Sequence, residues 1–240
     1  MIQWLKTVID FILPPRCLLC NKVIHTDNSL CTECFDKISF IAKPYCKHCG
    51  KPLPYNHSPH ELYCAECLSQ KDFQLFMCRS AIKYDVFSKK LILDFKFSDH
   101  IENKSLLAQW LFFAGRDIFS YKPDVILPVP LHYSRLFQRK YNQSAVLACE
   151  LSKLTNIPAD YSILKKYRYT KPQTICNGKQ RQKNIKDAFI VNDCTVVTGK
   201  HVVLIDDVYT TGATLTECAK VLKKSGAKKV SALTVARVLD

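Results

Sequence analysis

Short apolar runs alternate with longer stretches of helical periodicity through residues 72–240 of this 240-residue chain. The apolar runs predict buried strands, and the stretches between them predict helices. This alternation predicts an α/β fold, with a mostly parallel sheet and helices on both faces. The predicted strands are 76–84, 124–129, 188–191, 201–205 and 230–235, and the predicted helices are 86–97, 103–119, one that ends near Leu154, and one from Thr214 with Gly226 as its C-cap.

The segment 202–214, VVLIDDVYTTGAT, carries the strongest chemical signal in the chain. Its four leading apolar residues predict a strand that is buried on both faces, and Asp206 and Asp207 follow where this strand would leave its sheet. A turn of hydroxyl-bearing and small residues then opens into a helix, whose N-terminal N–H groups and dipole attract an anion. Gly212 would let the backbone approach a ligand closely. The segment therefore predicts a phosphate site beside a polyol or metal site.

Two simpler explanations of this segment fit less well. An acidic pair that only caps the next helix would explain one aspartate, but not two aspartates followed by three threonines around a glycine. A P-loop would require a lysine directly before the helix, and this chain has Ala213 at that position.

The segment resembles, at every position, the signature of type I phosphoribosyltransferases, which bind phosphoribosyl pyrophosphate (PRPP). The resemblance implies that PRPP binds together with Mg²⁺, and that Asp206 and Asp207 hold the ribose and form the catalytic pair of an active enzyme. It also implies that the turn cradles the 5′-phosphate. The implied PRPP-binding residues are Asp206, Asp207, Val208, Tyr209, Thr210, Thr211, Gly212, Ala213 and Thr214.

Eight of the thirteen cysteines form four CxxC pairs near the beginning of the chain. Each pair can aim two thiolates at one ion, and two pairs complete a tetrahedral zinc site without an open position for catalysis. Two structural zinc ions would therefore stabilise a segment that is too small to bury its own core. Sequential pairing is the simplest arrangement, and interleaved pairing is the alternative. The ligands of the sequential arrangement are Cys17, Cys20, Cys31 and Cys34 at the first site, and Cys46, Cys49, Cys64 and Cys67 at the second.

A group of cations follows the predicted strand 124–129. In the segment 127–143, LPVPLHYSRLFQRKYNQ, a turn after the strand presents Arg135, Arg139 and Lys140. Several cations on such a turn suit a pyrophosphate group. A solvated, basic helix start would be the better explanation if this segment stood alone, but the phosphate motif elsewhere in the chain favours pyrophosphate binding.

The same segment is similar to the ComF group of phosphoribosyltransferase-like proteins, of the ComFC type. The shared features are Pro-Val-Pro-Leu, Arg-x-x-x-Arg-Lys-Tyr-Asn-Gln and the N-terminal cysteine module, together with 95–97, 168–173, Arg181 with Asn184, and 188–189. The group usually has glycine where this chain has Lys140. The resemblance implies a cytoplasmic protein that binds single-stranded DNA and supports DNA uptake in natural transformation, alongside a helicase-like partner.

Charge is consistent with a nucleic-acid partner. Residues 165–186 contain eight Lys and Arg and no acids, with Tyr167 and Tyr169 between them. Such cations would follow a phosphate backbone while the tyrosines stack on unpaired bases. A loop that covers the active site and contributes cations to PRPP explains the segment equally well. The predicted DNA contacts are Lys165, Lys166, Arg168, Lys171, Lys179, Arg181 and Lys183.

Two domains are predicted. Residues 1–71 comprise an N-terminal amphipathic helix and the zinc-ribbon module, and residues 72–240 comprise the phosphoribosyltransferase-like domain, which contains 27 Lys and Arg against 15 Asp and Glu. The apolar stretch 1–15 is interrupted by Lys6 and Asp10, and it is too short for a transmembrane helix. We expect this stretch to pack on the protein, with peripheral membrane contact as the alternative, and we expect a cytoplasmic protein without an integral membrane segment.

Two functions from different classes fit these features. In the first, the protein binds PRPP and single-stranded DNA and serves DNA uptake. In the alternative, it is an active phosphoribosyltransferase that transfers the phosphoribosyl group to an unidentified base or small-molecule acceptor and releases pyrophosphate. The motifs place PRPP, but no residue identifies the acceptor.

Overall fold

A parallel four-stranded sheet forms the centre of the molecule. The computed structural model describes residues 13–54, 62–69, 73–97, 102–168 and 185–239. The strand order is β1–β6–β5–β2, and each strand is parallel to its neighbours. The strands have buried side chains on both faces, as expected for a parallel sheet that is covered on both sides. They are β1 (Cys78–Lys83), β2 (Val125–Pro128), β5 (His201–Tyr209) and β6 (Lys229–Arg237).

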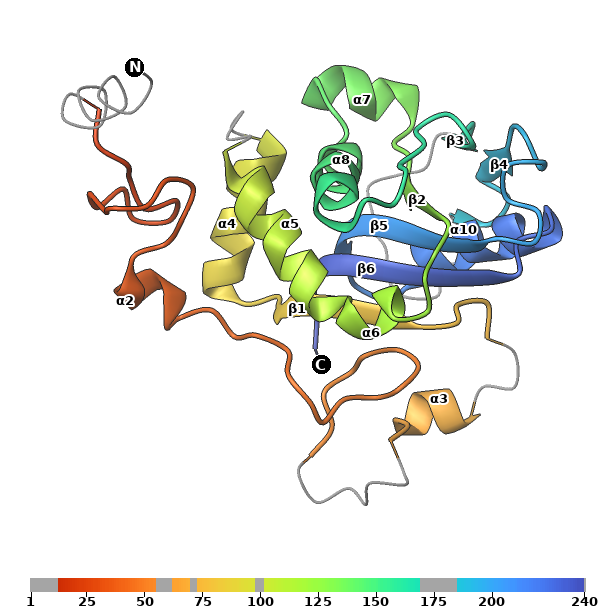
Figure 1. The fold of residues 1–240 in the computed structure, drawn as a ribbon, viewed down its shortest axis with the longest axis horizontal. Helices are drawn as coiled ribbons and strands as arrows, with labels where there is room; N and C mark the ends of the chain where they lie inside the picture. Colours follow the sequence, from red (N-terminus) through yellow and green to blue (C-terminus); the bar gives the residue numbers. More distant parts are fainter. Residues whose placement is uncertain (1–12, 55–61, 70–72, 98–101, 169–184, 240) are drawn as a thin grey trace.

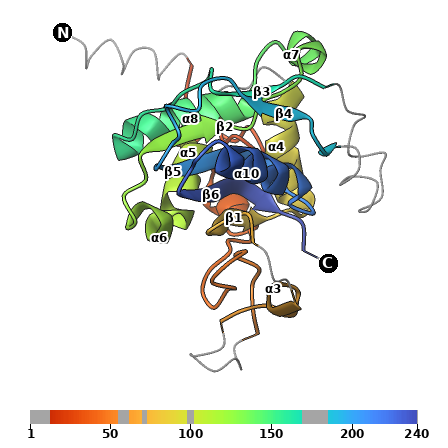
Figure 2. The same ribbon diagram turned by 90° about the vertical axis from the view of Figure 1, so that its right-hand side faces the viewer.

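Helices cover both faces of this sheet, as Figures 1 and 2 show. One face carries α5 (Asn103–Ala114) and α8 (Gln143–Thr155), and α4 (Val86–Phe97) packs beside α5. The other face carries α10 (Ala213–Lys224) and a short antiparallel pair, β3 (Leu164–Lys166) and β4 (Phe189–Val191). The predicted α/β fold with a parallel sheet and helices on both faces is confirmed.

Tertiary packing changes the bounds of several predicted elements. The helix predicted for 103–119 is interrupted at Gly115, where a Cβ atom would lie 2.9 Å from the Leu233 side chain, and it resumes as α6 (Arg116–Phe119). The strand predicted for 201–205 continues to Tyr209 because its backbone keeps pairing with β6. A further helix, α7 (Tyr133–Arg139), lies where the sequence predicted a turn. The strand β3 was not predicted.

The cysteine-rich part of the chain forms two lobes that pack on the sheet domain at different places (Figure 1). The first lobe, residues 13–41, contains α2 (Thr32–Phe35) and lies against α4 and α5. There the Lys90 ammonium donates to the Leu19 carbonyl at 2.6 Å, and the Phe40 ring lies 5.1 Å from the Trp110 ring. The predicted N-terminal helix falls mostly on residues 1–12, which lie outside the described residues.

The second lobe comprises the described part of residues 44–69 and contains α3 (Ala65–Ser69). It lies beside β1, below the sheet in Figure 1, and the backbones approach closely at Gly50. A Cβ atom at Gly50 would lie 2.5 Å from the Cys78 carbonyl oxygen. In the described part of the chain, no helix is long and apolar enough to cross a membrane.

Candidate functional site

The acidic pair and the turn that follows it lie at the carboxyl edge of the sheet. Strand β5 carries Asp206 and Asp207 close to its end, and the chain then turns to Gly212, the N-cap of α10. Gly212 has φ of 73°, in the left-handed region that favours glycine. The structure therefore brings two carboxylates and a helix N-terminus to one edge of the sheet, where ligands of open α/β sheets bind.

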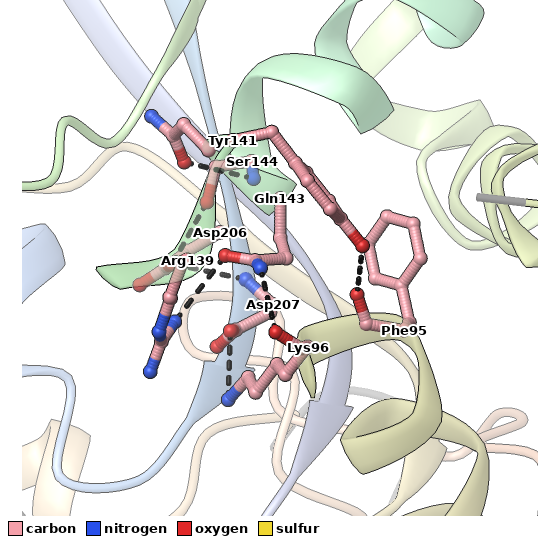
Figure 3. A network of polar contacts seen from close by, with 9 residues as sticks. Phe95, Lys96, Arg139, Tyr141, Gln143, Ser144, Asp206 and Asp207 are labelled. Carbon is pink, nitrogen blue, oxygen red and sulfur yellow. Dashed lines mark hydrogen bonds and ion pairs between the residues drawn. The ribbon is translucent and has the colours of Figure 1, made fainter. Parts of the chain in front are cut away.

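Side chains from two other elements hold the acidic pair, as Figure 3 shows. Asp206 Oδ1 accepts hydrogen bonds from its neighbour's backbone N–H at 2.9 Å and from Ser144 Oγ at 3.2 Å. Asp207 Oδ2 lies 2.7 Å from Lys96 Nζ, and these two side chains are only 17% and 16% exposed. Ser144 comes from the start of α8 and Lys96 from the end of α4. The pair therefore sits where β5, α4 and α8 meet.

This environment changes the protonation of Asp206. Burial raises the pKa of Asp206 to about 7, and the neighbouring Asp207 carboxylate acts in the same direction. The hydrogen bonds from the Asp207 N–H and Ser144, together with the Lys96 ammonium, oppose this rise. A ligand that brings a cation or hydroxyl donors would stabilise the charged carboxylate. The pair is thus suited to a ligand that carries a cation or a polyol.

The segment predicted to bind pyrophosphate, 127–143, is connected to the acidic pair by contacts with Lys96. Arg139 donates to Gln143 Oε1 at 3.2 Å, and Gln143 Nε2 donates to the Lys96 carbonyl at 3.1 Å (Figure 3). The Tyr141 hydroxyl donates to the Phe95 carbonyl at 2.6 Å. These contacts fix the end of α4 against the start of α8, so the Lys96 ammonium is held at the carboxylates.

Helix α7 carries the predicted pyrophosphate cations. Arg135 lies inside the helix and Arg139 is its last residue, and both are half-buried. Lys140 is the exposed C-cap of α7 and has φ of 64°. This left-handed backbone is the physical reason why glycine suits this position.

Only the first part of the predicted DNA-binding segment is described. Lys165 and Arg168 are exposed. Lys166 is half-buried, with its Nζ 5.4 Å from the centre of the Phe189 ring, and burial together with the charge of Arg135 lowers its pKa to about 8. The remaining predicted contacts, Lys171, Lys179, Arg181 and Lys183, lie outside the described residues.

The eight predicted zinc ligands form two clusters, and the CxxC pairs combine sequentially. Within each cluster all four Sγ atoms lie within 4.8 Å of one another. The Sγ atoms of Cys20 and Cys31 are 3.7 Å apart, and those of Cys49 and Cys64 are 3.6 Å apart. A tetrahedron with Zn–S bonds of about 2.3 Å has S–S edges of about 3.8 Å, so both clusters have the size that zinc requires. The clusters are Cys17, Cys20, Cys31 and Cys34, and Cys46, Cys49, Cys64 and Cys67.

Lys96 and Ser144 contact the acidic pair, and the sequence analysis assigned neither of them a role. Lys96 is the charged one of the two. It lies in a correctly predicted helix, but its partner Asp207 is distant in the sequence. The sequence contained one weak signal, because 95–97 is among the segments that resemble the ComF group. Only the packing of α4 against the end of β5 shows that this lysine faces the acids.

The fold and the site define a protein with a zinc-ribbon module and a phosphoribosyltransferase-type domain. A family model described as a double zinc ribbon domain matches residues 8–68, and one described as a phosphoribosyl transferase domain matches residues 99–239. Competence protein F of Haemophilus influenzae is 34% identical, over 92% of this chain and 96% of its own length. The chain therefore belongs to the ComF family of phosphoribosyltransferase-domain proteins.

Other relatives span nearly the whole chain. The DNA utilization protein YhgH of Escherichia coli K12 is 31% identical, over 95% of this chain and 99% of its own. Competence protein ComFC of Streptococcus pneumoniae is 26% identical, over 92% of this chain and 100% of its own. Among solved structures, the glutamine PRPP amidotransferase of B. subtilis is 19% identical with a TM-score of 0.40, over 60% of this chain and 30% of that chain.

Proposed function

We propose that this protein binds PRPP at the carboxyl edge of its sheet and handles single-stranded DNA in the cytoplasm during DNA uptake. The observation that supports PRPP binding most strongly is the arrangement of Asp206, Asp207 and the N-terminus of α10 on one edge. Ribose hydroxyls would donate to the two carboxylates. The 5′-phosphate would accept hydrogen bonds from backbone N–H groups of the phosphate loop, residues 210–214, with Gly212 permitting close approach.

The pyrophosphate group would lie toward the cations of α4 and α7. Lys96 is the nearest ammonium to the acids, and Arg135, Arg139 and Lys140 extend the positive charge along α7. Mg²⁺ commonly binds one or two carboxylates together with substrate phosphates, so two aspartates suit a Mg²⁺ that arrives with PRPP. Among the described residues, only the two cysteine clusters group three or more potential metal ligands. When bound, Mg²⁺ would neutralise part of the pyrophosphate charge.

The two cysteine clusters support structural zinc. We infer one ion in each cluster, within a module that ends near residue 71, and a phosphoribosyltransferase-like domain over 72–240. Thiolate zinc ligands are stable in a reducing compartment, which supports a cytoplasmic location. Both clusters carry four sulfur ligands, so neither ion would have an open coordination position.

The role in DNA handling rests on the relatives and on charge. Proteins named for competence and for DNA utilization match over nearly their full length. Exposed Lys165 and Arg168, with Tyr167 between them, begin the basic segment that would follow the phosphates of a single strand. We propose that a helicase-like protein of the uptake machinery delivers that strand.

Asp206 supports a second function, transfer of the phosphoribosyl group to an acceptor. A carboxyl group with a pKa of about 7 exchanges protons readily near neutral pH, which suits a general acid or base. Release of pyrophosphate from PRPP in the presence of candidate bases tests this function. If the protein binds PRPP but releases no pyrophosphate, it acts as a binding protein and not as a transferase.

Ligand-induced stabilisation tests the PRPP site. At a PRPP concentration of about 100 times Kd, binding adds about 2.7 kcal/mol to the free energy of unfolding, which raises Tm by roughly 5–10 °C. The isosteric double substitution Asp206→Asn with Asp207→Asn should abolish this rise. Asp193→Asn is the matched control, since Asp193 accepts from Thr195 in an exposed turn away from the sheet edge. An unchanged rise in the double variant would show that PRPP binds elsewhere.

Salt dependence tests DNA binding. Affinity for single-stranded DNA, measured by fluorescence anisotropy, should fall steeply with salt, with a slope of about −0.7 for each phosphate contact. Replacing Lys165 and Arg168 by alanine should weaken binding and reduce that slope by about one unit or more. Replacing the half-buried Lys104 on α5 and the exposed Lys153 on α8 removes the same charge at another place and serves as the control. Binding that does not change with salt would refute this proposal.

A further inference from the structure

Two buried arginines attach the second lobe to the sheet, and they do so differently. Arg79, in β1, donates to the Asp117 carboxylate at 2.7 Å and to the carbonyls of Cys78 and Lys47 at 2.7 and 2.9 Å. Arg237, the last residue of β6, donates to the Cys49 carbonyl at 2.6 Å. Only 5% of Arg237 is exposed. Both residues therefore bind the same lobe, but Arg237 binds it at a member of the second cysteine cluster.

Arg237 also contacts the sulfur of that cluster. Its Nη2 atom donates to Cys49 Sγ at 3.8 Å. A zinc ion with four thiolates carries a net charge of about −2, so with zinc bound the buried guanidinium would lie beside a compensating negative charge. Hydrogen bonds to ligating atoms orient them and tune the metal. Among the ion pairs of the described residues, none joins Arg237 to a carboxylate.

The other face of Arg237 contacts Tyr209, the residue directly before the phosphate loop. Its guanidinium carbon lies 4.1 Å from the centre of the Tyr209 ring, at the point where Tyr209 and Arg237 are partners in the β5–β6 ladder. The Tyr209 ring in turn packs on Gly212, because a Cβ atom there would lie 2.4 Å from the Tyr209 hydroxyl oxygen. A continuous chain of contacts therefore runs from the Cys49 sulfur to the glycine of the loop.

The same residues border an open space. Cys49, Tyr209, Thr210, Thr211 and Arg237 line one cavity of about 360 Å³. The Tyr209 ring has room to move into this cavity if the guanidinium does not hold it. Movement of the ring would remove the support of Gly212 and loosen the loop.

We propose that Arg237 and Tyr209 are positioning residues that hold the phosphate loop in place from the second zinc site. The PRPP part of this inference rests on the proposed function. Loss of zinc from the second cluster would remove the negative charge beside Arg237, and a buried guanidinium without a compensating charge is costly. The guanidinium then moves, the Tyr209 ring follows, and PRPP affinity falls. The zinc module is thus a support for the ligand site as well as for its own fold.

The experiment compares Arg237→Met with Arg79→Met in the full-length, zinc-loaded protein. Three quantities are measured: zinc content, PRPP affinity by calorimetry, and hydrogen exchange at the amides of 210–214. Both variants should be less stable than the wild type. Only Arg237→Met should exchange faster at 210–214 and bind PRPP at least tenfold more weakly, with two zinc ions still bound. Arg237→Lys, which keeps the positive charge but lacks the planar guanidinium group, should recover part of the PRPP affinity.

The second part of the experiment removes zinc from the wild type and from Arg237→Met. Chelation should accelerate exchange at 210–214 in the wild type, and it should add little in Arg237→Met, because the connection is already broken. Equal loop exchange and equal PRPP affinity in Arg237→Met and Arg79→Met would overturn the inference. If Arg237→Met does not fold, the same comparison is made with Arg237→Lys. Wild-type protein that binds no PRPP would refute the proposed function instead, while loop exchange would still decide whether Arg237 positions the loop.

Discussion

The contact between Tyr209 and the phosphate loop can be measured with a pair of glycine substitutions. Gly212 and Gly199 both have φ of 73°, so alanine at either position incurs the same left-handed strain of about 1–2 kcal/mol. A Cβ atom at Gly199 would meet no atom within 4 Å. At Gly212 it would lie 2.4 Å from the Tyr209 hydroxyl oxygen and 2.6 Å from the adjoining ring carbon. The two substitutions therefore share this strain and differ in their packing, while Gly212 is in addition the N-cap of α10.

The packing difference sets the expected magnitude. The Tyr209 ring must move to accommodate the new methyl group, and overpacking of this kind costs about 1–3 kcal/mol. We expect Gly199→Ala to lower the free energy of unfolding by about 1–2 kcal/mol and Gly212→Ala by about 2–5 kcal/mol. Urea denaturation gives both values, and a PRPP titration should show weakened binding only for Gly212→Ala. Equal losses of stability in the two variants would refute the close packing of Tyr209 on the loop.

Three further predictions follow from the backbone, the acids and the cysteines. Lys140→Gly should increase the free energy of unfolding by about 0.5–1 kcal/mol, because glycine relieves left-handed strain at a small entropic cost. Urea denaturation should show a smaller gain in stability for Asn156→Gly, since asparagine tolerates the left-handed backbone better than lysine does. The pKa of Asp206 is raised to about 7, so the unfolded chain loses this proton first and stability should fall as pH rises from about 4 to 7. Denaturation measured across this pH range should show that the free energy of unfolding of Asp206→Asn falls less steeply with pH, by up to about 1.4 kcal/mol per pH unit. An unaltered slope would contradict the raised pKa. Metal analysis should find two zinc ions per chain and one in Cys46→Ser, and two ions in that variant would contradict the assignment of the second cluster.

Parts of this molecule could be predicted because the relevant residues are close in the sequence. The segment from Val202 to Thr214 forms a strand end, a turn and a helix start by itself, so its residues reach the same edge of the sheet in any parallel arrangement. Each CxxC pair likewise brings two sulfur atoms together over a single turn. The alternation of apolar runs and helical periodicity predicted the parallel sheet, since each element must bury its apolar side.

Other boundaries depended on neighbours that are distant in the sequence. Strand β5 continues beyond the acids because β6 is there to pair with it, up to Tyr209 and Arg237. The helix after residue 103 is interrupted at Gly115, where the Leu233 side chain lies so close that a Cβ atom would not fit. Local propensity contains no information about either neighbour, so a prediction from sequence pattern places both ends incorrectly.

The sequence by itself determined the α/β fold, the motif at 202–214 and the eight cysteines of the two clusters. Only the tertiary structure decided that the cysteine pairs combine sequentially, that Lys96 faces Asp207, and that Arg237 joins Cys49 to Tyr209. The physical reason is the range of the interactions. Motifs arise from residues joined by a few peptide bonds, whereas these contacts form only when burial of apolar faces brings separate helices, strands and lobes together.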